Sequence, residues 1–131
     1  MVKTIMVVDD EPGVIYTIKQ GLEHVDSEYR VITANSGKQC LELLGMHPTP
    51  DLILLDIMMP EMSGWETLKK IKENSSWRGI SIVFLTARTD PYAKNAGGFL
   101  ADGYIEKPFE VHKLKERIDR ILDEKENNKL M

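Results

Sequence analysis

Short apolar runs alternate along this chain with stretches of helical periodicity, and this alternation limits the possible folds more than any other feature. The runs are rich in Ile, Val and Leu and contain few polar residues. This composition is typical of strands that are covered on both faces, as in a parallel sheet. The five runs occupy residues 5–8, 29–33, 52–55, 80–85 and 103–105.

Apolar residues spaced three or four positions apart follow the runs and predict helices. The first helix has Pro12 near its start, where proline is tolerated, and its apolar face is Val14, Ile15, Ile18, Leu22 and Val25. The second, third and last helices have shorter or similar stripes. These are Cys40, Leu41 and Leu44; Trp65, Leu68 and Ile71; and Val111, Leu114, Ile118, Ile121 and Leu122.

The remaining helix, after the fourth run, is expected to be short and marginal. Asp90 is a suitable N-cap and Pro91 a suitable first residue, but few apolar residues follow, and Gly97-Gly98 should end the helix. Five strands that alternate with helices predict an α/β fold. We expect a (βα)5 doubly wound, five-stranded parallel sheet in a flavodoxin-like three-layer sandwich, with strand order 2-1-3-4-5.

Length and composition indicate a single soluble domain. We expect it to span residues 1–123 of the 131, with 124–131 as a polar tail or the start of a linker. The net charge of −4 argues against direct nucleic-acid binding. There is no signal peptide pattern and no apolar run near the roughly 20 residues of a membrane helix, so a cytoplasmic location is expected. Cys40 is the only cysteine, so the chain can form no internal disulfide.

Reactive side chains gather where the predicted strands end. Asp9 and Asp10 follow the first strand, Asp56 the third, Thr86 the fourth and Lys107 the fifth. In open α/β sheets ligands bind beyond the carboxyl ends of the strands, and order 2-1-3-4-5 makes the first and third strands neighbours. Three close carboxylates would repel one another unless a cation joined them, and oxygen ligands suit Mg²⁺. With an ammonium and a hydroxyl nearby, the group could accept a phosphoryl group on an aspartate.

Each of these residues, taken alone, also has an ordinary structural interpretation. An acidic pair after a strand often lies at a helix N-terminus, and a threonine at a strand end often bonds to the backbone. Asp56 alone could be a turn residue, and Lys107 alone a solvated lysine. Their occurrence together at one sheet edge favours the chemical interpretation.

At these positions the sequence resembles the receiver domain of two-component response regulators, over about residues 3–123. Four blocks in order carry the resemblance. They are Ile5-Met-Val-Val-Asp9-Asp10-Glu11-Pro12, Asp51-Leu-Ile-Leu-Leu-Asp56-Ile-Met-Met-Pro60-Glu-Met-Ser-Gly64, Ile82-Val-Phe-Leu-Thr86-Ala87 and Ala101-Asp-Gly-Tyr104-Ile-Glu-Lys107-Pro108-Phe109. The resemblance implies a signalling protein rather than an enzyme.

The resemblance implies a role for each site residue. Asp56 is the expected phosphorylation site. Asp10, Asp56 and the backbone carbonyl of Met58 are the expected Mg²⁺ ligands, with Asp9 bound through water; Mn²⁺ could substitute. Thr86 and Lys107 are expected to contact the phosphoryl group and Tyr104 to act as an aromatic switch. Pro108 is expected to follow a cis peptide bond. Met58 and Arg88, two residues after Asp56 and Thr86, are expected to tune the lifetime of the phosphate.

The resemblance also implies partners. A histidine kinase or phosphotransfer protein should donate the phosphate, and an output partner or a second copy should read the face formed by the fourth helix, fifth strand and last helix. The sequence departs from the family at 95–100, where Leu100 replaces an expected glycine.

Two other classes of protein fit the sequence less well. A haloacid-dehalogenase-type phosphatase also uses an aspartyl nucleophile and Mg²⁺, but it needs a second acid where this chain has Met58. A nucleotide- or flavin-binding module is less favoured, since no glycine-rich phosphate loop follows a strand.

Overall fold

The computed structural model describes residues 2–87 and 101–130. Its five strands are β1 (Lys3–Val8), β2 (Tyr29–Ala34), β3 (Leu52–Asp56), β4 (Ser81–Ala87) and β5 (Gly103–Lys107). All pair in parallel, in the order β2-β1-β3-β4-β5. The predicted fold class and strand order are confirmed, and β1 and β3 are neighbours at the centre of the sheet.

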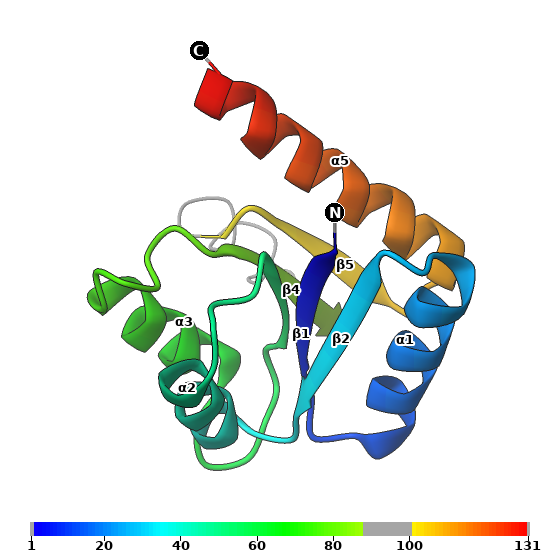
Figure 1. The fold of residues 1–131 in the computed structure, drawn as a ribbon. Helices are drawn as coiled ribbons and strands as arrows, with labels where there is room; N and C mark the ends of the chain where they lie inside the picture. The colour runs from blue at the N-terminus through cyan, green and yellow to red at the C-terminus, as the bar shows by residue number, and fades with distance from the viewer. Residues whose placement is uncertain (1, 88–100, 131) are drawn as a thin grey trace.

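Helices cover both faces of the sheet (Figure 1). They are α1 (Pro12–Val25), α2 (Gly37–Met46), α3 (Gly64–Glu73) and α5 (Val111–Leu130). The α2 and α3 helices pack on one face around Phe84 and Ile53, and α1 and α5 on the other around Leu54 and Ile18. The expected fourth helix at 90–98 lies outside the described residues. None of the described helices is long and apolar enough to cross a bilayer.

Local sequence explains where the helices begin. Ser36 caps α2 by accepting a hydrogen bond from the Gln39 amide, and Ser63 caps α3 by accepting one from the Glu66 amide. Pro12 is the first residue of α1, as its fixed φ favours. α5 continues to Leu130, well past the end of its apolar stripe at Leu122, so most of the polar stretch 124–131 is helical.

Two aspartates close the edge of the sheet where β3 and β5 begin. The Asp51 carboxylate accepts a 2.8 Å hydrogen bond from the Thr4 amide, and its own amide donates to the Thr4 carbonyl. Asp102 repeats this pattern with Ile82 of β4, at 2.8 and 2.7 Å. Each aspartate therefore extends its ladder by one step and fixes the register of the strand that follows it.

Candidate functional site

The opposite edge of the sheet carries the predicted site residues, beginning at the end of β1. Asp9 is fully buried, and its amide donates to the Ala34 carbonyl of β2 at 3.1 Å. One of its carboxylate oxygens accepts a 2.9 Å hydrogen bond from the Glu11 amide. Asp10, the next residue, is exposed. The pair therefore presents one fixed, dry carboxylate and one carboxylate open to solvent.

Asp56 is the last residue of the central strand β3 and is only 5% exposed. The backbone of Asp56 lies very close to Gly64, because a Cβ at Gly64 would stand 2.3 Å from the Asp56 carbonyl oxygen. The Gly64 amide also donates to the Ile57 carbonyl at 2.8 Å. The start of α3 thus lies against the backbone of Asp56, at a distance that only glycine allows.

Lys107, the last residue of β5, brings an ammonium group to these carboxylates. Its Nζ lies 2.8 Å from Asp9 Oδ2, 3.6 Å from Asp56 Oδ1 and 3.7 Å from Glu11 Oε1. Burial acts to lower the pKa of Lys107, but the hydrogen bond to Asp9 and the nearby carboxylates outweigh it and raise the pKa. The lysine is therefore a fixed positive charge at this edge. The peptide bond from Lys107 to Pro108 is cis, as expected.

The charge on Asp56 is disfavoured in the protein alone. Burial is the largest cause, and the charge of Asp9 adds to it, so that the pKa of Asp56 rises to about 7 although Lys107 acts to lower it. One carboxylate oxygen from each of Asp9, Asp10 and Asp56 lies within 4.8 Å of the other two. A cation among them would relieve this repulsion.

These residues fit a Mg²⁺ ion. The donor set consists of carboxylate oxygens, which hard cations prefer, and the exposed side of Asp10 leaves room for the waters that Mg²⁺ usually keeps. Mn²⁺ has the same preference for such oxygens.

Thr86 contributes a hydroxyl that lacks a partner. The residue is 2% exposed, and its Oγ1 is the one buried side-chain polar atom among the described residues that has no hydrogen bond. Thr86 faces Glu106 in the β4–β5 ladder, next to the pair of Ala87 and Lys107. A buried hydroxyl without a partner is costly, so an acceptor that reached it would be bound favourably.

The other predicted residues occupy more varied positions. Met58 is 69% exposed beside Asp56. Tyr104 of β5 is partly buried and packs against the core on the side of α2 and α3. Arg88 lies outside the described residues. The sequence did not single out Glu11 as a neighbour of Lys107, nor Gly64 as the contact of Asp56; adjacency to Asp10 was the only signal for Glu11.

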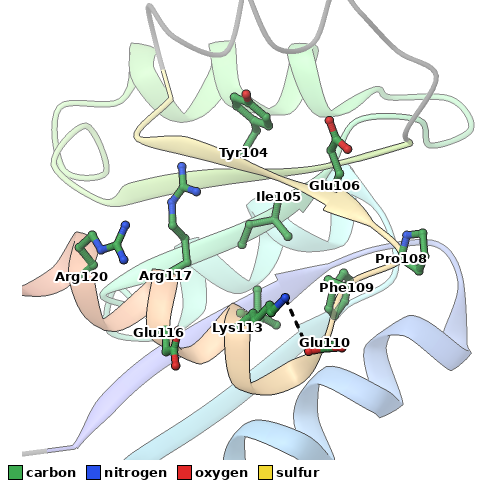
Figure 2. A pocket seen from close by; sticks show the side chains of 11 residues that line it. Tyr104, Ile105, Glu106, Pro108, Phe109, Glu110, Lys113, Glu116, Arg117 and Arg120 are labelled. Atoms are coloured by element: carbon green, nitrogen blue, oxygen red, sulfur yellow. Dashed lines mark ion pairs between the residues drawn. The ribbon is translucent and has the colours of Figure 1, made fainter.

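Two hollows lie near this edge. One, of about 640 Å³, lies between α1 and the segment after β5 and is lined by Val14, Thr17, Lys107 and Phe109 among others. The second, of about 580 Å³, lies between β5 and α5, where Figure 2 shows Tyr104, Arg117 and Arg120 around it.

Comparison with known proteins identifies one family and several relatives. The family model of the response regulator receiver domain matches residues 5–119. A probable cyclic di-GMP phosphodiesterase of Vibrio cholerae is 40% identical over 98% of this chain, which spans 28% of that protein. The alkaline phosphatase synthesis transcriptional regulatory protein PhoP of Bacillus subtilis is 37% identical over 93% of this chain and 49% of its own length. The chain thus spans half or less of these two relatives.

Solved structures of receiver domain proteins have a similar fold. A CheY-like response regulator receiver domain protein of Methanospirillum hungatei has a TM-score of 0.82 at 38% identity, covering 95% of this chain and 98% of that one. The chemotaxis protein CheY4 of Vibrio cholerae has a TM-score of 0.83 at 28% identity, covering 92% and 99%.

Proposed function

Because this chain belongs to the response regulator receiver domain family, we propose that Asp56 is its phosphoacceptor, with Mg²⁺ held by Asp10, Asp56 and the Met58 carbonyl. Asp9 would bind the ion through water. The observation that carries the proposal is the juxtaposition of Asp56, the Lys107 ammonium at 3.6 Å and the unpartnered Thr86 hydroxyl at one sheet edge.

The chemistry follows from these groups. An Asp56 carboxylate oxygen attacks the phosphorus of a phosphohistidine, the P–N bond breaks, and the histidine leaves with a proton from solvent. A bound Mg²⁺ supplies positive charge for the phosphoryl oxygens. Lys107 pairs with one of these oxygens, exchanging part of its contact with Asp9, and the Thr86 hydroxyl donates to another. Exposed Met58, together with Arg88, would limit the approach of water and so set the phosphate lifetime.

A donor must approach from solvent at this edge. The hollow between α1 and the segment after β5 borders Lys107 and has an apolar wall of Val14, Pro108 and Phe109. It suits an apolar side chain of the histidine kinase or phosphotransfer protein that we propose as donor, acting in the cytoplasm.

We propose that the signal leaves through Tyr104 and the face of β5 and α5. Movement of Thr86 Oγ1 toward the phosphate frees space beside Tyr104, which would turn inward and change the hollow shown in Figure 2. An output partner or a second copy would read that change, together with the expected fourth helix.

Labelling with acetyl phosphate and Mg²⁺ tests the proposal. The wild type should gain one phosphoryl group by mass spectrometry, and hydroxylamine should remove it, as it does from an acyl phosphate. Asp56→Asn should gain none, whereas Glu42→Gln, which removes an exposed and remote carboxyl, should label normally. Unchanged labelling of Asp56→Asn would exclude Asp56 as the acceptor. The phosphatase alternative predicts instead steady turnover of a small phosphomonoester, for which Met58 provides no second acid.

A further inference from the structure

Gly21, in the third turn of α1, leaves a notch that Val111 of α5 fills. A Cβ at position 21 would stand 2.5 Å from Val111 Cγ1, 2.9 Å from Cγ2 and 3.1 Å from Cβ. A Cβ on Gly13 of the same helix, or on Gly45 of α2, would meet nothing within 4 Å. The absence of a side chain at 21 therefore has a specific steric reason, which is the close approach of the first residue of α5. Figure 1 shows these two helices on the same face of the sheet.

Val111 cannot easily move out of this notch. It begins α5, and its β-branched side chain has one strongly preferred rotamer in a helix. The turn that follows is fixed by hydrogen bonds from the Lys113 and Leu114 amides to the Glu110 carbonyl, at 3.1 and 3.0 Å. A displaced Val111 would therefore carry the start of α5 with it.

Only three residues separate Val111 from Lys107. At its other end this segment is held by the β4–β5 ladder, in which Lys107 pairs with Ala87. Between the two ends Pro108 has a fixed φ, and Phe109 lies beside α1, lining the same hollow as Val14. Figure 2 shows Pro108, Phe109 and Glu110 along this connection. With so few free torsions, a shift at Val111 is transmitted to the residue that bears the ammonium group.

We propose that Gly21 is a positioning residue for phosphoryl transfer. Its notch seats Val111 and so fixes segment 107–111, which holds the Lys107 ammonium 2.8 Å from Asp9 and 3.6 Å from Asp56. The inference rests on the proposed function of Asp56. It adds that the packing of α1 on α5, remote from the carboxylates, sets the efficiency of the reaction.

A double-mutant cycle tests the notch. Gly21→Ala should lower the rate of labelling by acetyl phosphate at least fivefold, because the added Cβ displaces Val111. The double variant Gly21→Ala with Val111→Ala should recover at least half of the wild-type rate, since it removes both clashing methyl groups and leaves two Cβ atoms 3.1 Å apart, which a shift of a few tenths of an ångström relieves. Gly45→Ala is the matched control and should label at the wild-type rate.

Two further readouts separate positioning from general damage. Mg²⁺ affinity, measured by NMR titration, should stay within twofold of wild type in Gly21→Ala, because the proposed ligands lie at the end of β3 and in the residues that directly follow β1 and β3. In the metal-free protein, the amide resonances of Lys107 and of residues 109–111 should shift, while that of Asp56 should not.

The outcomes are distinct. A folded Gly21→Ala that labels at the wild-type rate overturns the inference, as does a loss that the double variant fails to restore. If Gly21→Ala does not fold, Val111→Ala alone decides: by emptying the notch it should slow labelling at least twofold with Mg²⁺ affinity retained, and a wild-type rate overturns the inference. Failure of the wild type to label at all would instead refute the proposed function.

Discussion

Replacing Asp56 with Asn should stabilise the metal-free protein, and the gain should grow with pH. Burial, with the charge of Asp9, raises the pKa of Asp56 from 3.8 to about 7 in the folded chain. Between these two values the folded chain still holds a proton that the unfolded chain has released. The stability of the wild type therefore falls as the pH rises through this window and levels off above it.

The magnitude follows from the separation of the two pKa values. Each pH unit between 3.8 and 7 corresponds to about 1.4 kcal/mol, so the ionised Asp56 lowers the free energy of unfolding by about 4 kcal/mol above pH 7. An amide carries no charge and removes this effect. Asp56→Asn should gain less than about 2 kcal/mol at pH 5 and about 4 kcal/mol at pH 8.5.

Urea denaturation followed by circular dichroism, with EDTA present, measures the difference at both pH values. The slope with denaturant should be unchanged, so that the midpoint alone reports stability. Glu42→Gln, which neutralises an exposed carboxyl on α2, should change stability by less than about 0.5 kcal/mol at either pH. Added Mg²⁺ should narrow the gap, because an ion bound at the proposed site would stabilise the folded wild type. An equal gain at both pH values, or a loss at high pH, would refute the reasoning.

Three other substitutions test the site. Gly64→Ala should lower the free energy of unfolding by at least about 2 kcal/mol, since its Cβ would meet the Asp56 carbonyl; thermal denaturation measures this, with Gly45→Ala as an unhindered control. Thr86→Val should raise the free energy of unfolding, measured by urea denaturation, by about 1 kcal/mol, because it removes the unpartnered hydroxyl. A lower free energy of unfolding would show that the hydroxyl has a partner. Lys107→Ala should lower it by about 3 kcal/mol at neutral pH, because Asp9 is left buried and unpaired, and should also slow acetyl phosphate labelling; stability equal to wild type would contradict the pairing.

The sequence predicted the strands well because the central ones are buried on both faces, and burial leaves a continuous apolar run. It placed the site residues at one edge for the same reason: the end of a run is the end of a strand. It was less accurate for β5, which was expected at 103–105 but runs to Lys107. β5 is the outermost strand of the sheet and is only partly buried along its whole length, so it can contain polar residues. Its last two residues, Glu and Lys, therefore gave no apolar signal.

Contacts made by loops and between packed helices could not be predicted, because they produce no periodic pattern in the sequence. The approach of Gly64 to Asp56 and of Gly21 to Val111 depends on the three-dimensional path of the chain. How far α5 extends beyond Leu122 was likewise not predicted, because the residues there are polar and form no apolar stripe. The proximity of the Glu11 carboxylate to Lys107 depends on the arrangement of β1 and β5 in the sheet, which no local sequence pattern encodes.

The aspartates at the other edge bear on how such a domain can diversify. A slip of one residue between strands would turn every side chain to the opposite face. Asp51 and Asp102 oppose that slip by their hydrogen bonds at the end of the sheet that lacks the site residues. The register of the strands therefore does not depend on the loops that carry the site. The register of the strands that carry Asp56 and Lys107 is therefore held from the end of the sheet opposite the site, and changes in the loops after β3 and β5 can alter the positions of side chains at the site without shifting that register.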